Sequence, residues 1–451
     1  MAKQIDLLQG SITKSLTALA LPIMGSQLIQ MAYNLIDMLW IGRVGAGAVA
    51  AVGAAGMFMW LSNGLVILAR IGGQVLVAQS IGAGDIKKAG RYAAAALQLG
   101  GALAVGFTLL LTLGAAPLIG FFNLNSPAVV AQARAYLIIV GAGMFFSFIN
   151  QVLVAVINAT GDSRTPFFAM GCGLGLNLVL DPMLIFGAGP FPRWGVAGAA
   201  AATVLAQVVV FGVLVRYAAR EQRLFPHVQL RRLAAKEELQ AIVRISGPSA
   251  VMNVLFPLIS MVIARMVAGW GDNAVAVQKV GSQIESISWM TADGFAAAVN
   301  SFIGQNYGAG NLQRARKGFK VSFALMTVWG VLCTCLLVFC AAPIFRLFIP
   351  EAQVLPMGVD YLVILGFSEL FMCWEILVEG AYAGFGHTLP ASVLSTVFTA
   401  LRIPAALVLS ATALGLSGIW WSISISSICK GMILTVMFVV FLNKMTRRQE
   451  M

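Results

Sequence analysis

Apolar runs of about twenty residues follow one another along almost the whole chain, separated by short stretches rich in Gly, Pro or charged residues. A run of that length is what an α-helix needs to cross the hydrocarbon core of a bilayer. The composition agrees, because 59% of the residues are hydrophobic and 10% are charged, whereas soluble domains carry about 25% charged residues. The chain is predicted to be an all-α polytopic membrane protein. A soluble enzyme, a nucleic-acid-binding protein and a secreted disulfide scaffold are disfavoured.

The hydropathy pattern predicts twelve transmembrane helices. At that number the spans and their loops use up the chain, which leaves no room for a soluble domain. We place the spans at residues 15–40, 47–78, 92–120, 128–156, 166–188, 194–217, 241–268, 274–305, 319–347, 357–383, 390–412 and 417–443.

The basic residues predict how the helices are oriented. With a cytoplasmic N-terminus, 20 of the 29 Lys and Arg residues fall on the cytoplasmic side, about five on the opposite side and four within spans. Cytoplasmic loops of membrane proteins carry such an excess of positive charge. We therefore expect both termini to be cytoplasmic, and the net charge of +12 needs no nucleic-acid partner to explain it.

The second half of the chain repeats the first. A shift of 226 residues aligns QSIGAGDIKKA at 79–89 with QNYGAGNLQRA at 305–315, Pro22 with Pro248, and Gly45 with Gly271. With small changes in length, GDSRTP at 161–166 faces GHTLP at 386–390, and GVAG at 195–198 faces GLSG at 415–418. Six spans in each half give a parallel repeat, a transporter architecture with its substrate site between the halves. We predict an N-lobe at 1–217, a cytoplasmic linker at 218–240 and a C-lobe at 241–451.

Polar residues form a stripe along the first span. Gln27, Gln30, Asn34 and Asp37 recur at helical spacing, so they share one face. A buried acid inside a membrane is a functional candidate because its charge is costly there. We expect this stripe to face a water-filled cavity; the alternative is that Asp37 lies at the outer boundary and is simply solvated.

The fifth span carries a second group of polar residues. Asn177 and Asp181 are one helical turn apart, and Pro182 frees a backbone carbonyl one turn earlier. These oxygens could hold a proton relay or a hard cation such as Na⁺; the alternative is a polar cluster that only closes backbone bonds. Thr203 in the sixth span is a weaker candidate, since an intramembrane Thr usually bonds its own helix.

Acids also occur within the spans of the second half, at Glu285, Asp293, Glu375 and Glu379. Two interpretations stay open for them: ion pairs inside the lobe, for example with Lys279 or Arg402, or a second transport site. The sequence has no Walker A motif and no His or Cys spacing for a metal or a nucleophile. We expect neither enzymatic activity nor a cofactor.

Taken together, these segments resemble the multidrug and toxic compound extrusion (MATE) family. The matching stretches are LALPIMGSQLIQMAYNLIDMLWIGRVG, VAQSIGAGD, NATGDSRTP, LNLVLDP and GVAGAAAAT, followed in the second half by VQKVGSQI, IGQNYGAG and GHTLP. They are most similar to the bacterial branch named for DNA-damage-inducible protein F (DinF). The resemblance implies two six-helix lobes in a V and export of drugs and organic cations in exchange for H⁺ or Na⁺.

The resemblance also implies roles for individual residues. Asp37 matches the aspartate that the family protonates, and Asn177, Asp181 and Thr203 match its polar neighbours. Pro22 matches a proline at which the first helix is proposed to bend.

These implications predict a secondary active antiporter in a bacterial inner membrane. Coupling to H⁺ is favoured over Na⁺, because residues 241–268 lack the carboxylate that some sodium-coupled members have there. Na⁺ at Asp37, Asn177 and Asp181 is the less favoured case. We expect a monomer in the lipid bilayer, with drugs or organic cations as its small-molecule partners. The alternative function is a flippase for lipid-linked precursors.

Overall fold

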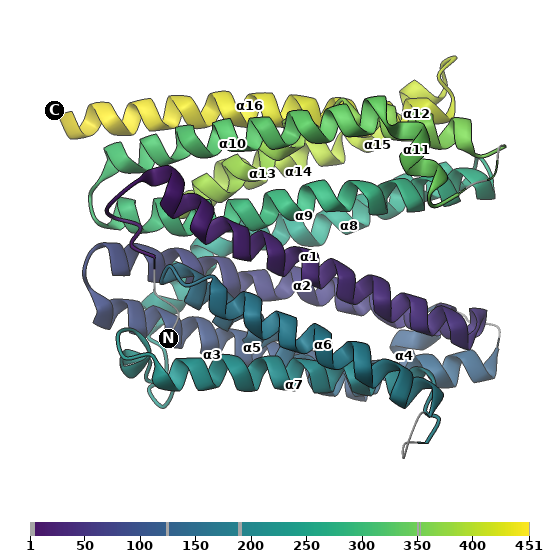
Figure 1. The fold of residues 1–451 in the computed structure, drawn as a ribbon, viewed down its shortest axis with the longest axis horizontal. Helices are drawn as coiled ribbons and strands as arrows, with labels where there is room; N and C mark the ends of the chain where they lie inside the picture. Colours follow the sequence, from purple (N-terminus) through teal and green to yellow (C-terminus); the bar gives the residue numbers. More distant parts are fainter. Residues whose placement is uncertain (1–4, 123–125, 188–191, 350, 352, 451) are drawn as a thin grey trace. The chain divides into compact units, whose positions relative to one another are not determined.

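All regular elements in the described part of the chain are helical (Figure 1). The computed structural model describes residues 5–122, 126–187, 192–349, 351 and 353–450, with only the backbone described for residues 46, 272 and 448–450. The helices are α1 (Ile12–Val44), α2 (Ala46–Gly82), α3 (Ile86–Leu113), α4 (Ala115–Gly120), α5 (Pro127–Ala159), α6 (Arg164–Phe186), α7 (Val196–Arg220), the 3₁₀ turn η1 (Phe225–His227), α8 (Lys236–Ala268), α9 (Asp272–Gly308), α10 (Leu312–Phe339), α11 (Ala341–Arg346), α12 (Leu355–Gly366), α13 (Glu369–Gly384), α14 (Thr388–Ala400), α15 (Arg402–Ser410) and α16 (Leu416–Glu450).

These helices correspond to the twelve predicted spans, and the all-α membrane fold is confirmed. Within the described residues, ten stretches are long and apolar enough to cross a membrane. The pair α12–α13, bent by 45°, supplies an eleventh. The remaining span is α9, which is more polar because it carries Lys279, Glu285 and Asp293.

Four predicted spans are interrupted. The predicted spans 92–120 and 319–347 end in the short helices α4 and α11, which follow breaks at Gly114 and Cys340. The tenth span breaks between α12 and α13. The eleventh breaks at Leu401, shortly before Pro404, where proline removes a backbone donor and disfavours the helical bond to the preceding turn.

The internal repeat is visible in the helix boundaries. Helices α9, α10 and α11 begin and end 226 residues after α2, α3 and α4. The repeated GAGD and GAGN segments build the same turn: Gly84 and Gly310 adopt φ of 77° and 73°. Asp85 and Asn311 then accept hydrogen bonds of 2.9 and 3.0 Å from the backbone N–H three residues later. These residues therefore end one helix and cap the next.

The helices gather into two compact units. Unit 1 comprises Leu21–Ala250 and the residues before Leu7, and unit 2 comprises Leu7–Ala20 and Val251–Met451. In unit 1, α5 is central and packs against α2, α3 and α7; in unit 2, α13 is central and packs against α9, α10 and α16. The division into lobes at 1–217 and 241–451 stays a prediction, since these units are defined by packing alone.

Two helices are shared between the units. The start of α1, up to Ala20, packs with unit 2, and the start of α8, up to Ala250, packs with unit 1. Both changes of unit occur within two residues of a proline, Pro22 in α1 and Pro248 in α8. Neither helix has backbone contacts as extensive as those of α5 or α13. The first helix of each half, α1 and α8, is therefore less tightly packed than α5 and α13.

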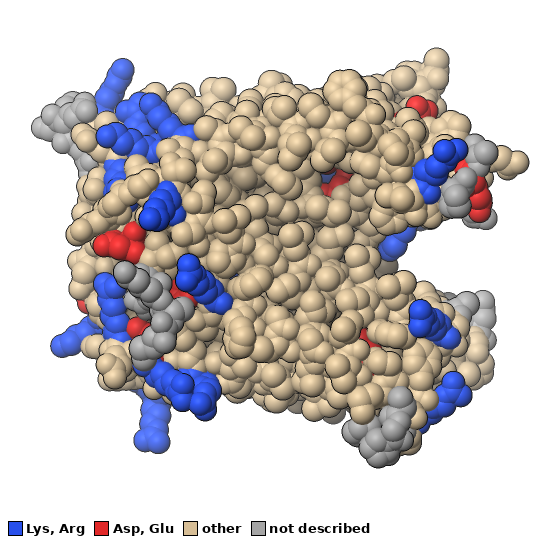
Figure 2. Space-filling model, in the orientation of Figure 1, with Lys and Arg blue, Asp and Glu red and all other residues tan. Residues whose placement is uncertain are grey.

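Charged side chains gather at the helix ends of each unit, as Figure 2 shows. Lys and Arg dominate there, and the middle of the helices is almost free of charge on the visible face. This distribution is the one that a lipid-embedded surface requires.

Candidate functional site

A cluster of polar side chains lies inside unit 1, and we call it the unit 1 cluster. It combines residues from four helices: α1, α5, α6 and α7. Its members interact electrostatically with one another. They are Tyr33, Asp37, Tyr136, Asn177, Asp181 and Thr203.

The innermost part of the cluster is the Asn177–Asp181 pair on α6. The Asn177 amide donates a hydrogen bond of 3.1 Å to Asp181 Oδ1, as their spacing of one turn predicts. Both side chains are fully buried, with 0% exposure. α6 continues through Pro182, so the carbonyl of Leu178 lacks its usual helical donor.

Helix α1 brings a second carboxylate toward this pair. Asp37 is half-buried and acts electrostatically on Asp181. Tyr33, one turn before Asp37, is buried beside Thr203 of α7. Side-chain contacts hold this part of α1 on α6: the ring of Phe167 covers Gly25, and Trp40 packs edge-to-face on Phe186.

Several oxygens of the unit 1 cluster are buried and have no hydrogen-bond partner among the described residues. They include an oxygen from each carboxylate, Asp37 Oδ1 and Asp181 Oδ2. Buried polar atoms are almost always hydrogen-bonded, because an unpaired one is costly. The others are Asn177 Oδ1, Thr203 Oγ1 and the Tyr33 hydroxyl.

Neither carboxylate of this cluster is neutralised by a basic side chain. In the described residues, no Lys or Arg lies within ion-pair distance of Asp37 or Asp181. A buried carboxylate must be compensated by a positive charge or take up a proton. The cluster is therefore suited to bind a proton or a cation.

A transition-metal or calcium site is not evident. The described residues contain no group of three or more His, Cys, Asp or Glu placed to hold a metal ion. Any cation here would depend on the amide and hydroxyl oxygens as well as on the two carboxylates.

The remaining predicted residues of α1 precede the cluster. Gln30 is half-buried, Asn34 is exposed, and the Gln30 amide lies 3.5 Å from Asn34 Oδ1. Pro22 lies within α1, and its carbonyl accepts a 3.0 Å bond from Ser26 Oγ. The polar stripe thus leads from an exposed surface of α1 to Asp37.

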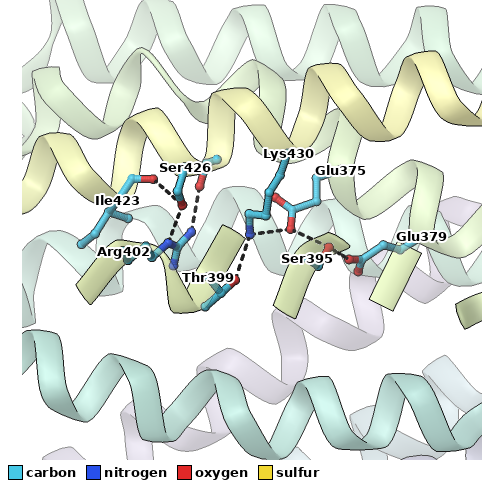
Figure 3. Close-up of polar contacts among 9 residues, drawn as sticks. Glu375, Glu379, Ser395, Thr399, Arg402, Ile423, Ser426 and Lys430 are labelled. Atoms are coloured by element: carbon cyan, nitrogen blue, oxygen red, sulfur yellow. Dashed lines mark hydrogen bonds and ion pairs between the residues drawn. The ribbon is translucent and has the colours of Figure 1, made fainter. Parts of the chain in front are cut away.

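Unit 2 contains a different polar group, the unit 2 network (Figure 3). Lys430 of α16 forms an ion pair of 2.6 Å with Glu375 of α13. Ser395 of α14 donates to Glu379 Oε1 at 2.5 Å and lies 3.4 Å from Glu375 Oε1. Lys430 Nζ also donates to Thr399 at 3.4 Å.

Ion pairs inside the lobe were one of two interpretations of these acids, with Lys279 and Arg402 as examples of a partner. Lys279 is exposed, and Arg402 donates instead to Ser426 and Ser427 at 2.6 and 2.9 Å. The partner of Glu375 is Lys430 of α16. The sequence does not reveal which face of α16 packs against α13.

The other acids of the second half lie around this network. Glu285 accepts a hydrogen bond of 3.3 Å from the Tyr361 hydroxyl and lies within electrostatic range of Arg402. Asp293 acts on Glu379. Unit 2 therefore combines several acids with two buried cations, whereas the charged members of the unit 1 cluster are both acids.

Several residues of these sites were not singled out from the sequence as site residues. Tyr33 had a usable signal, because it is one turn from Asp37 on the polar stripe. Lys430 had one as well, because a basic residue within a predicted span is costly, whereas Tyr136 had none.

Comparison with known proteins places the chain among membrane transporters. The MatE family profile matches residues 22–183 and 248–408. A probable multidrug resistance protein NorM from Thermotoga maritima is 30% identical over 414 residues, 91% of this chain and 88% of that protein. An FAD transporter from Shewanella oneidensis is 28% identical over 81% of this chain and 80% of its own length. A crystal structure of MATE in the bent conformation superposes with a TM-score of 0.91 at 24% identity, over all of both chains.

Proposed function

Because the chain belongs to the MATE family, we propose that it is a secondary active antiporter that exports cationic or amphipathic drugs in exchange for protons. Its multidrug-resistance relatives support drug export. The unit 1 cluster supports a positively charged substrate, because it offers two carboxylates and no basic side chain within ion-pair distance among the described residues.

One observation carries the assignment of the coupling ion: buried oxygens of Asp37 and Asp181 lack a partner in the described residues. A proton needs a single oxygen, so each carboxylate can be neutralised separately. Sodium needs several oxygens at once in a closed shell, and part of the oxygen set is already engaged, because Asp181 Oδ1 accepts a hydrogen bond from Asn177. The geometry therefore favours H⁺, with Na⁺ at Asp37, Asn177 and Asp181 as the alternative ion.

We assign the conformational step to helix α1. Its two parts belong to different units, the change occurs next to Pro22, and its backbone packing is loose. The existence of a bent conformation in a related structure fits a helix that bends at this proline. Bending would move Asp37 relative to Asp181. The charge of the unit 1 cluster would then be linked to the side of the membrane toward which the transporter opens.

The family and its bacterial relatives further support a multi-pass protein of the inner membrane. The excess of basic residues in alternate loops supports cytoplasmic termini. We propose a monomer, with one cluster per molecule sufficient for exchange.

An anionic substrate fits the cluster less well. The Shewanella relative is an FAD transporter, and a lipid-linked precursor would also present phosphate. Phosphate is normally recognised by Arg, Lys or backbone donors, and the described unit 1 cluster contains acceptors and hydroxyls. The flippase alternative is therefore less favoured.

Transport in proteoliposomes tests the proposal. A cationic dye is loaded, and a pH gradient or a Na⁺ gradient is imposed separately. We expect a pH gradient alone to drive dye movement against its concentration. Movement driven by Na⁺ at fixed pH, without a response to the pH gradient, would contradict proton coupling.

A further inference from the structure

The unit 2 network has an ammonium group at its centre (Figure 3). Lys430 is 3% exposed and Glu375 is 7% exposed, so the ion pair is shielded from solvent. A buried pair of this kind is seldom more stable than apolar residues of the same size. Its presence in a membrane helix therefore indicates a role besides holding the fold.

Both polar contacts of the ammonium with described residues are to oxygens. Lys430 Nζ contacts Glu375 Oε1 at 2.6 Å and Thr399 Oγ1 at 3.4 Å. Ser395 Oγ lies 3.4 Å from the same Glu375 oxygen and joins it to Glu379. Carboxylate and hydroxyl oxygens are the ligands that a hard inorganic cation prefers.

The corresponding helices of unit 1 are joined without charge. In the internal repeat Gly161 aligns with Gly386, and the same alignment makes Asn150 the counterpart of Glu375. The Asn150 amide donates at 2.9 Å both to the carbonyl and to the side chain of Gln207 on α7. In both units, polar side chains therefore join these two helices. In unit 2 the joining groups are a carboxylate and an ammonium group, whereas in unit 1 they are uncharged.

We propose that the Lys430 ammonium is a tethered cation that occupies, in unit 2, a site otherwise suited to an inorganic monovalent cation such as Na⁺. The tether makes the positive charge permanent, so unit 2 needs no sodium ion to neutralise Glu375. Removing the ammonium while keeping the oxygens should create a sodium site. The inference depends on the contacts within unit 2 and not on proton coupling in unit 1.

The test measures sodium binding to Lys430→Met by thermal unfolding of the purified full-length protein. Met keeps most of the length of the Lys stem and removes the charge. Midpoints are compared in NaCl and in choline chloride of equal ionic strength, without drug or a pH gradient. We expect Lys430→Met to unfold below wild type in choline chloride and to rise by several degrees, saturably, with Na⁺, because a ligand that binds only the folded state stabilises it.

Two controls separate sodium binding from a general salt effect. Lys279→Met removes an exposed lysine of α9 in the same unit and should show the same shift between the two salts as wild type. Glu375→Gln/Lys430→Met also removes the main oxygen ligand, and its shift should return to that of wild type.

A shift of Lys430→Met between the two salts no larger than that of wild type would overturn the proposal and leave the ion pair a structural one. If Lys430→Met cannot be recovered folded, Lys430→Ala carries the same comparison, because it also removes the ammonium and leaves the oxygens of Glu375 and Thr399 in place. Sodium bound at the unit 1 cluster would raise the midpoints of wild type and of every variant alike, so the proposal is judged by the additional shift of Lys430→Met over wild type.

Discussion

Replacing Asp37 by Asn tests the proposed coupling most directly. Asp37 is half-buried, whereas Asp181 is fully buried behind it. The exposed Asn34 precedes Asp37 on the same stripe. A proton that reaches Asp181 along α1 therefore passes Asp37 first. Asn keeps the shape of the side chain but cannot release a proton, so Asp37→Asn should stop proton exchange at the entrance to the cluster.

The size of the effect follows from the number of protons exchanged. If one proton is exchanged for one singly charged drug molecule, a gradient of one pH unit sustains a tenfold drug gradient, equal to about 1.4 kcal/mol. Asp37→Asn should lower this ratio to one. Asp181→Asn should be milder, because Asp37 can still exchange a proton and Asn177 still has an acceptor at residue 181.

The assay measures the steady-state drug ratio across proteoliposomes rather than the initial rate. The ratio depends on coupling and not on how many molecules are active, so a partly misfolded preparation does not imitate uncoupling. Asp360→Asn is the matched control, since it makes the same change at an exposed carboxylate of α12. A tenfold ratio in Asp37→Asn would refute the reasoning.

Three other changes test separate parts of the structure. Pro22→Ala should slow efflux while leaving the steady-state ratio intact, because it stiffens α1 without touching the cluster; an unchanged rate would remove the hinge role. Glu375→Gln should lower the free energy of unfolding by about 3–5 kcal/mol, because it leaves Lys430 buried without its partner. The double variant with Lys430→Met should recover most of that loss. If chemical denaturation shows that the losses of the two single variants add up in the double variant, Glu375 and Lys430 do not interact energetically. Gly72→Ala should destabilise the protein by about 1–3 kcal/mol, because a Cβ at this position of α2 would come within 2.5 Å of a backbone carbonyl of α8. Gly56→Ala is the control, since a Cβ at that position of the same helix meets open space. Equal melting temperatures of the two variants would show that α8 does not pack against Gly72.

Much of the fold could be predicted because lipid imposes one dominant rule. Every span must be a long apolar helix, so its place is visible in hydropathy alone. The repeat was visible for another reason: Gly84 and Gly310 stand where the backbone needs positive φ, and few residues tolerate it. The breaks at Gly114 and Leu401 were missed, since hydropathy does not change across them.

The sites were only partly predictable. Asn177 and Asp181 were recognisable as a pair because i and i+4 positions meet on any helix. The Glu375–Lys430 pair joins residues on two helices far apart in sequence, and helical periodicity does not say which faces of two helices meet. The division of α1 at Ala20 lies beside Pro22, where the resemblance implied a bend, but the apolar pattern of the helix does not mark it.

The two halves of the chain have kept the same helices but distribute charge differently. The unit 1 cluster leaves two carboxylates without a basic partner in the described residues, so its charge can change with each proton or substrate that binds. In the unit 2 network, the Lys430 ammonium lies 2.6 Å from Glu375 and compensates its charge. A transporter that alternates between two states needs one site whose charge is variable. A second variable site in the other half would let a proton or cation bind without drug leaving, and the coupling ratio would fall. Lys430 therefore removes one variable charge from unit 2, and if exchange runs through the unit 1 cluster as proposed, replacing that lysine should loosen the exchange as well as create a sodium response.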